Sequence, residues 1–260
     1  MTTMLQVEGL AKTFGGIKAV QDVSFSVDEG EIVGLIGPNG AGKTTAFNLI
    51  SGVMRPGKGR VEFMGDNIVG LRPHQIVRKG LTRTFQAANV YPASTVRENV
   101  LRGALVRSTV GLFDGLFGTS VARSAERTSC GKVDELLDEL SLLRHANELA
   151  GSLAYGNQRR LGVAIALATE PRLLLLDEPV AGLNPEESHG FGRLLLSLVA
   201  RRHLTVILIE HHMKMVMELC GKVIVLDHGQ KIAEGKPAEI QANKAVIEAY
   251  LGPEEDDDAA

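Results

Sequence analysis

Hydrophobic residues follow two different patterns along this chain. Near the N-terminus, apolar and polar residues alternate over 5–8 and 19–27, and this alternation predicts strands with one buried face. Three later runs are almost entirely apolar, which is typical of parallel strands buried on both faces. They cover 32–36, 173–176 and 205–209. Two more segments, 222–226 and 230–233, flank the turn 227–229 and predict a late hairpin. We therefore expect an antiparallel start that leads into an α/β core.

Helical patterns occupy the middle of the chain. Apolar residues recur at helical spacing over 130–143, and 95–98 fits the capping box that opens a helix. From about 88 to 160 we predict a mostly helical subdomain inserted between strands of the core. Its apolar segment 111–118 either packs inside or faces a partner, and packing is the commoner fate of such residues. The acidic run within 253–260 predicts a solvated C-terminal tail.

One glycine-rich stretch brings in chemistry. It follows the apolar run 32–36 and precedes a helical pattern, and it fits the phosphate-binding loop G-x-x-x-x-G-K-S/T. The matching residues are Gly37, Pro38, Asn39, Gly40, Ala41, Gly42, Lys43, Thr44 and Thr45. The stretch predicts a site for a nucleoside triphosphate. The alternative is a glycine-rich turn between strand and helix that binds no ligand.

The residue types in this loop match the needs of a triphosphate. Glycines let backbone N–H groups curl around phosphate oxygens, and the helix opening near Gly42 adds the positive end of its dipole. The Lys43 ammonium suits the β and γ phosphates. The Thr44 hydroxyl suits Mg²⁺, a hard cation that prefers oxygen ligands. We therefore expect a nucleotide bound with magnesium.

Two acidic residues follow the apolar run 173–176. Asp177 stands at a strand end, where a carboxylate can join the shell of a Mg²⁺ ion beside a phosphate loop. Glu178 can polarise water for attack on a γ phosphate. Acids at strand ends are also common on protein surfaces, so the pair alone leaves a surface role open.

Composition narrows the possible partners. The chain has 260 residues, 44% of them hydrophobic, and a net charge of −3 from 28 basic and 31 acidic groups. This balance argues against broad nucleic-acid binding, which needs a basic face. No apolar run approaches the roughly 18 residues that a membrane-spanning helix needs, and no secretion signal is evident. The two cysteines are far apart, as in a reducing cytosol. We expect a soluble, cytoplasmic protein that reaches membranes only through a partner.

Further motifs place the loop and the acidic pair in a known order. These motifs are Gln86, the segments 153–160 and 181–184, and His211. With the phosphate loop and the acidic pair, they make the chain resemble the ATP-binding-cassette family of transport ATPases over about residues 4–252. The resemblance implies a P-loop NTPase (RecA-like) core with an antiparallel β subdomain and an inserted helical subdomain. It also implies ATP hydrolysis with Mg²⁺.

The resemblance implies roles for residues within one copy of the domain. Phe14 is expected to stack on adenine, and Lys43 to stabilise the charge on the transferred phosphate. Asp177 and Gln86 are expected to join Thr44 at Mg²⁺. Gln86 is also expected to touch the attacking water and to sense the helical subdomain.

Other roles involve catalysis and a second copy of the domain. Glu178 matches the general base, and His211 matches the switch histidine that contacts the γ phosphate. Asn184 lies in the loop that contacts the second copy. The signature motif, which caps the nucleotide held by that copy, is Ala154, Tyr155, Gly156, Asn157 and Gln158.

Some residues depart from the usual family pattern. The usual signature serine is Ala154, which removes one hydroxyl, although the helix start retains backbone donors. The usual contact-loop aspartate is Asn184, and Phe14 replaces a commoner tyrosine while preserving stacking. The chain resembles the ATPase subunits of high-affinity branched-chain amino-acid importers in the segments 82–86, 153–161, 181–185, 209–211 and 246–252. That branch includes relatives that carry urea, amides or other small solutes.

The expected function is the ATP-hydrolysing motor subunit of such an importer. The implied partners are a second cassette of the same or similar sequence, integral membrane permease subunits and, indirectly, a solute-binding protein. These partners would hold the chain at the cytoplasmic face of the inner or plasma membrane. One alternative is the ATPase of a lipid or lipopolysaccharide exporter, whose cassette chemistry is the same. Another is a soluble cassette protein acting on nucleic acid or the ribosome, which a single cassette without heptads disfavours.

Overall fold

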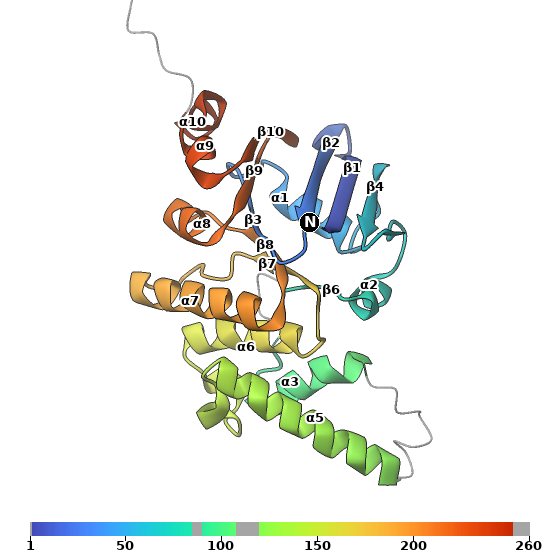
Figure 1. Cartoon of the computed structure of the whole chain (residues 1–260), viewed down its shortest axis with the longest axis vertical. Coiled ribbons are helices and arrows are strands. Elements are labelled where there is room, and N and C mark those ends of the chain that lie inside the picture. Colours follow the sequence, from blue (N-terminus) through green and yellow to red (C-terminus); the bar gives the residue numbers. More distant parts are fainter. Residues whose placement is uncertain (1, 85–89, 108–119, 252–260) are drawn as a thin grey trace, which may run out of the picture.

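A computed structural model describes residues 2–84, 90–107 and 120–251. Figure 1 shows two sheets and a set of helices that continues below the larger sheet. The smaller sheet has the strand order β2-β1-β4-β5, and its neighbouring strands run antiparallel. Its strands are β1 (Thr3–Phe14), β2 (Ile17–Asp28), β4 (Lys58–Phe63) and β5 (Asp66–Asn67). The predicted antiparallel start is therefore confirmed.

The strands β1 and β2 are longer than their alternating patterns predict. Phe14 pairs with Ile17, so a two-residue turn joins the strands directly. Gly15 and Gly16 have φ angles of 50° and 93°, and two positive φ angles in succession are what the tight turn of a twisted hairpin requires. Backbone pairing next to this turn extends both strands beyond 5–8 and 19–27, the segments in which apolar and polar residues alternate.

The larger sheet contains the three apolar runs and both strands of the predicted late hairpin. Its strand order is β10-β9-β3-β8-β7-β6, with β10 antiparallel to β9 and the other pairs parallel. The strands are β3 (Ile32–Ile36), β6 (Leu81–Arg83), β7 (Leu173–Asp177), β8 (Thr205–Ile209), β9 (Lys222–Asp227) and β10 (Gln230–Gly235). The apolar residues of the three runs and of β9 are buried. The predicted α/β class with a parallel core is thus confirmed.

The larger sheet divides the hydrophobic core in two, because successive side chains of a strand point to opposite faces. Leu173 and Leu175 of β7 join a cluster that includes the smaller sheet and α1 (Lys43–Ile50). Leu174 and Leu176 join a second cluster on the opposite face. That face is covered by α6 (Tyr155–Leu167), α7 (Pro185–Arg202) and α8 (Met213–Leu219).

The middle of the chain is helical, as predicted. Helix α3 (Val96–Ala104) begins with the expected capping box, in which the Glu98 backbone N–H donates to Oγ1 of Thr95 at 3.2 Å. Helix α5 (Ser120–Glu139) starts earlier than the predicted start near residue 130. The prediction was wrong there because good helix formers such as alanine, arginine and glutamate extend a helix without adding to its apolar stripe. The helix ends before Ser141, whose φ of 57° is left-handed.

Shorter elements complete the described chain. They are α2 (Pro73–Lys79), η1 (Leu105–Arg107), η2 (Leu143–His145), η3 (Ala150–Ser152), α9 (Pro237–Gln241) and α10 (Lys244–Leu251). Strand β6 pairs with β7 from Leu81 to Arg83. The described residues do not include Gln86, 111–118 or 253–260. The subdomain limits near 88 and 160 stay a prediction.

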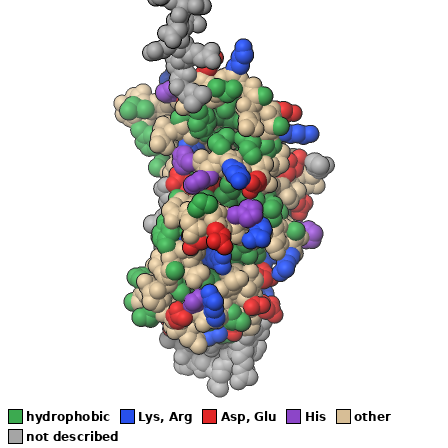
Figure 2. Space-filling view, turned by 90° about the vertical axis from the view of Figure 1, so that its left-hand side faces the viewer, with side chains coloured by type: hydrophobic (Ala, Val, Ile, Leu, Met, Phe, Trp, Pro, Cys, Tyr) green, Lys and Arg blue, Asp and Glu red, His purple; other side chains and the backbone are tan. Residues whose placement is uncertain are grey.

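The surface on the side of α7 and α8 mixes charges of both signs. Figure 2 shows acidic, basic and histidine side chains interspersed along this face. No helix within the described ranges is long and apolar enough to cross a membrane.

Candidate active site

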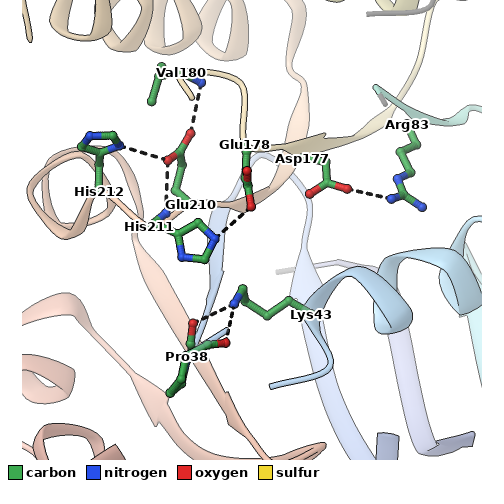
Figure 3. A network of polar contacts seen from close by, with 10 residues as sticks. Pro38, Lys43, Arg83, Asp177, Glu178, Val180, Glu210, His211 and His212 are labelled. Atoms are coloured by element: carbon green, nitrogen blue, oxygen red, sulfur yellow. Dashed lines mark hydrogen bonds and ion pairs between the residues drawn. The ribbon is translucent and has the colours of Figure 1, made fainter. Parts of the chain in front are cut away.

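The candidate site lies where the parallel strands of the larger sheet end. Strands β3, β8, β7 and β6 are neighbours in that order, and the carboxyl ends of parallel strands meet at one edge. The phosphate loop follows β3, Glu210 and His211 follow β8, Asp177 and Glu178 lie at the end of β7, and Arg83 ends β6. Figure 3 shows these side chains converging. Segments far apart in the sequence thus form one site.

The phosphate loop requires glycine at two positions. Gly37 has a φ of 148°, and a Cβ there would lie 2.0 Å from the carbonyl oxygen of Leu226. Gly42, with a φ of 98°, is the N-cap of α1, and a Cβ there would lie 2.4 Å from the carbonyl oxygen of Ala19. Glycine allows both the backbone conformation and the close approach. The loop can therefore present backbone N–H groups at the start of α1, an arrangement suited to phosphate.

Lys43 begins α1 and points back into the loop. Its side chain is buried, and Nζ donates hydrogen bonds to the carbonyl oxygens of Gly37 at 2.7 Å and Pro38 at 2.8 Å. Burial lowers the pKa of Lys43, while the carboxylates of Glu178 and Asp177 act to raise it. The ammonium group is therefore within electrostatic reach of both acids.

Glu178 and His211 contact one another directly. His211 Nε2 lies 2.8 Å from Glu178 Oε1, with 41% of the histidine side chain and 19% of the glutamate side chain exposed. Glu178 has a φ of 49°, a left-handed conformation that is costly for a residue with a side chain. Its backbone N–H donates to the carbonyl oxygen of Ile209 at 2.9 Å, which ties it to β8. The pair offers a proton-accepting carboxylate beside an imidazole.

Asp177 has a partner that the sequence patterns did not identify. Arg83 Nη2 lies 2.7 Å from Asp177 Oδ2, and the two side chains are only 5% and 1% exposed. The one signal in the sequence is a charged residue at the end of a short buried strand. Within the described ranges, Oδ1 of Asp177 is also buried and has no hydrogen-bond partner. A hard cation would satisfy that oxygen, so Asp177 fits its predicted metal role.

A cation at this position would need oxygen ligands other than carboxylates. The described part of the chain contains no group of three or more His, Cys, Asp or Glu residues that could hold a metal ion. Thr44 lies exposed in the first turn of α1, where a hydroxyl can serve as a ligand. Thr45, which follows it, is half-buried. The donor set fits a cation that is shared with bound phosphates.

The signature motif forms the start of α6. Ala154 is the N-cap and has no side-chain oxygen to offer, and Gln158 Nε2 donates to the carbonyl oxygen of Leu153 at 2.9 Å. Gly156 and Asn157 lie in the first turn. Since α6 and α1 belong to opposite clusters, the sheet separates the signature helix from the phosphate-loop helix of the same chain.

The signature motif also contacts the loop that follows Glu178. A Cβ on Gly182 would lie 2.9 Å from Tyr155 Cε1, so the tyrosine ring packs against the backbone there. Arg159 Nη2 donates to the carbonyl oxygen of Ala181 at 3.3 Å and also contacts the Tyr155 hydroxyl. These contacts join the signature motif to the predicted contact loop.

Three other predicted residues have separate positions. Phe14 ends β1 with 43% of its surface exposed, and Lys12 Nζ lies 5.5 Å from the centre of its ring. The Asn184 side chain accepts a hydrogen bond from the Glu187 backbone N–H at 2.9 Å and caps α7. Asn184 thus has a structural role in addition to the predicted contact. Gln86 lies outside the described residues.

The C-terminal helix α10 flanks the phosphate loop, a relationship that the sequence did not suggest. Asn39 and Gly40 of the loop and Glu248 of α10 line the same pocket. Burial raises the pKa of Tyr250, and a hydrogen bond with the backbone of Gly37 acts to lower it. Helix α10 therefore packs against the phosphate loop and supports it.

Comparison with protein families identifies the class of this protein. A model described as ABC transporter matches residues 20–181, and one described as branched-chain amino acid ATP-binding cassette transporter matches residues 230–255. The chain therefore belongs to the ABC transporter family and is an ATPase of the ABC type. The predicted family and enzyme class are confirmed.

Individual relatives extend this similarity over nearly the whole chain. The high-affinity branched-chain amino acid transport ATP-binding protein BraF of Pseudomonas aeruginosa is 43% identical over 249 residues, which is 96% of this chain and 98% of that protein. The lipopolysaccharide export system ATP-binding protein LptB of Haemophilus influenzae is 32% identical over 250 residues, again 96% and 98% of the two chains.

Solved structures agree with the fold. The ATP-binding cassette MJ1267 in its ADP conformation has a TM-score of 0.85 and 32% identity, covering 97% of this chain and all 100% of its own. A dimeric MJ0796 cassette bound to ADP and Pi has a TM-score of 0.76 and 25% identity, covering 90% and 99%. The predicted fold of a nucleotide-binding cassette is thus confirmed.

Proposed function

We propose that the chain is the motor subunit of an importer for branched-chain amino acids or a related small solute, and that it couples closure of a cassette pair to a membrane permease. The observation that carries this proposal is the 2.8 Å contact of Glu178 with His211 beside a phosphate loop, in a chain 43% identical to BraF. The family match over residues 230–255 adds support for the importer branch.

The phosphate loop binds the triphosphate of ATP in this proposal. Backbone N–H groups between Gly37 and Gly42 surround the phosphates, and Lys43 exchanges its carbonyl partners for phosphate oxygens. Burial lowers the pKa of Lys43. The negative charge of the bound phosphates acts in the opposite direction and favours the ammonium form of Lys43. The exposed ring of Phe14 stacks on the adenine.

Hydrolysis then depends on Glu178. Its carboxylate accepts a proton from the water that attacks the γ phosphorus, while the bond from that phosphorus to the leaving ADP oxygen breaks. His211 holds the carboxylate and contacts the γ phosphate, and Gln86 contacts the water. Lys43, His211 and the loop N–H groups stabilise the charge that develops on the phosphate oxygens.

Asp177, Thr44 and Gln86 are the residues proposed to hold Mg²⁺. The Oδ1 atom of Asp177, which has no hydrogen-bond partner within the described ranges, supports this assignment. When bound, Mg²⁺ would neutralise charge on the β and γ phosphates. Arg83 keeps the other carboxylate oxygen in place from the protein side.

Two cassettes complete each nucleotide site in this proposal. The signature residues 154–158 of one cassette close the nucleotide held by the other, and the loop with Asn184 lies at their contact. The dimeric MJ0796 structure with ADP and Pi supports a two-cassette arrangement. Closure moves the helical subdomain, about 88–160, and drives the permease, to which a solute-binding protein delivers its cargo. The chain then lies on the cytoplasmic face of the inner or plasma membrane.

The alternatives have less support. The exporter protein LptB is 32% identical to this chain, compared with 43% for BraF. A nucleic-acid-binding protein needs a basic surface, whereas this chain has a net charge of −3, and the face in Figure 2 mixes charges of both signs. Uptake of radiolabelled leucine by vesicles containing the permease and this chain would separate import from export.

The substitution Glu178→Gln tests the proposed chemistry. Turnover of MgATP should fall by about 10²-fold or more, because the amide cannot accept the proton. Binding of MgATP should persist, and size-exclusion chromatography should then show a stable cassette dimer. Glu135→Gln, at an exposed position of α5, is the matched control and should behave as wild type. Unchanged turnover in Glu178→Gln would remove Glu178 from this role.

A further inference from the structure

A third carboxylate lies within the site and has no role in the proposed chemistry. Glu210 directly follows β8 and is 1% exposed. Its Oε1 accepts a hydrogen bond from the backbone N–H of Val180 at 3.1 Å. Its Oε2 accepts one from the backbone N–H of His211 at 3.2 Å, and His212 Nδ1 lies 3.6 Å from the same oxygen. Figure 3 shows one side chain joining two loops.

The two backbone N–H groups that Glu210 binds belong to His211, a member of the reacting pair, and to Val180, close to Glu178. Val180 comes two positions after Glu178, and His211 is the partner of Glu178 itself. The Glu178 backbone N–H is fixed to Ile209, so its segment is held on both sides. Glu178 has a left-handed backbone, which persists only when surrounding contacts enforce it. Glu210 supplies one of those contacts.

We propose that Glu210 is a positioning residue that holds the carboxylate of Glu178 and the imidazole of His211 in register for water activation. One rigid carboxylate links the ends of β7 and β8, so displacement of either loop also moves the other. Both oxygens accept backbone N–H groups, which compensates for the burial of the charge. This inference rests on the proposed role of Glu178 as the general base.

A purely structural role makes a different prediction. A buried carboxylate that only stabilises the fold would, when replaced, lower the amount of folded protein and leave the catalytic constants of the remainder unchanged. A positioning residue should instead lower kcat and spare the KM for MgATP, because the phosphate loop and Phe14 hold the nucleotide without its help.

The test compares two substitutions at this position in the full-length chain. Glu210→Gln keeps the shape and one oxygen acceptor, so it is the variant most compatible with folding. Glu210→Ala removes both acceptors. Both should lower kcat for MgATP hydrolysis, by at least tenfold in Glu210→Ala, with KM within twofold of wild type. Amide hydrogen exchange in Glu210→Ala should be at least tenfold faster at Val180 and His211.

Asn99→Ala is the matched control. Asn99 is also 1% exposed, and its amide holds the backbone of Tyr91 and Thr95 in the helical region, away from the reacting residues. This variant should retain kcat and normal exchange at Val180 and His211.

Three outcomes have distinct meanings. Wild-type kcat in both Glu210 variants, with an active wild-type chain, would overturn the positioning role. So would unchanged exchange at Val180 and His211 in Glu210→Ala, which needs no catalysis to measure. If Glu178→Gln hydrolyses ATP at the wild-type rate, the general-base proposal fails instead, and the inference about Glu210 falls with it.

Discussion

Arg83 and Asp177 form an ion pair that is almost completely removed from solvent, with Nη2 2.7 Å from Oδ2. The same guanidinium donates from Nη1 to Oδ1 of Asn48 at 2.5 Å and lies over the ring of Phe47, 5.6 Å from its centre. Both Asn48 and Phe47 belong to α1, the helix that begins in the phosphate loop. Arg83 therefore fixes the strand that ends in Asp177 to the helix that begins at Lys43.

Replacement of Arg83 should destabilise the protein strongly. Arg83→Ala would leave the Asp177 carboxylate buried without its partner, and breaking a buried ion pair from one side costs about 3–5 kcal/mol. Urea unfolding measures this loss. The control is Arg202→Ala, which breaks a partly exposed pair with Glu139 and should cost less than about 1 kcal/mol. Equal losses in the two variants would show that the buried pair contributes no more than a surface pair.

Two glycines of the phosphate loop should differ in their tolerance of alanine. A methyl group added at Gly40 would meet open space, and its φ is 83°, so Gly40→Ala should cost only the left-handed strain of about 1–2 kcal/mol. Gly37→Ala would place Cβ 2.0 Å from the Leu226 carbonyl oxygen and force the backbone to move. We expect a further loss of at least about 1 kcal/mol, measured by thermal unfolding. Similar melting temperatures for the two variants would contradict the close approach.

The backbone of Glu178 should store strain that glycine relieves. Glu178 has a φ of 49°. Alanine at this position would keep the energetic cost of the left-handed conformation, whereas glycine would remove it. After the greater chain entropy of glycine in the unfolded state is subtracted, the glycine variant should be more stable by up to about 1 kcal/mol. Urea denaturation compares the pair, both of which lack the carboxylate. A more stable alanine variant would mean that the position carries no strain.

The thiol of Cys220 should resist ionisation in the folded protein. Burial, with a smaller contribution from the Glu210 carboxylate, raises its pKa from 9.0 to about 12. The folded state then holds the proton more tightly than the unfolded state. Its contribution to stability is complete below pH 9 and is lost as the pH rises toward 12, by up to about 1.4 kcal/mol per pH unit. Comparison with Cys220→Ala isolates this slope in unfolding experiments.

Alkylation with iodoacetamide at about pH 8.5 checks the same point independently. Cys130 is half-buried and should react in the native protein, while Cys220 should react only after unfolding. Rapid native labelling of Cys220 would show that its thiol is neither buried nor raised in pKa.

Asn184 allows its cap to be separated from its predicted contact with a second cassette. Asn184→Asp keeps an oxygen that can accept the Glu187 N–H, so stability should be unchanged. Asn184→Ala should lose about 1 kcal/mol, measured by urea unfolding. If Asn184 also contacts the second cassette, the affinity of the dimer with MgATP should be lower in the alanine variant by more than its loss of folding stability explains. A dimer of wild-type affinity in both would leave only the cap.

Several parts of this protein follow from neighbouring residues and were readable from the chain. The phosphate loop is local, because Gly37, Gly42 and Lys43 act within one turn between a strand and a helix. The capping boxes at Thr95 and Asn184 each join residues three positions apart. The apolar runs 32–36, 173–176 and 205–209 also predicted buried strands, since parallel strands covered on both faces admit few polar residues.

Other contacts arise only when distant strands become neighbours. Arg83 meets Asp177 across 94 positions, and Val180 meets Glu210 across 30. The docking of α10 beside the phosphate loop likewise joins segments that are far apart in the sequence. No local pattern encodes these pairs, because strand order and register are set by burial of the two hydrophobic clusters as a whole. The residue types that do the chemistry could be found in sequence, but the groups that hold them in place depend on the packed sheet.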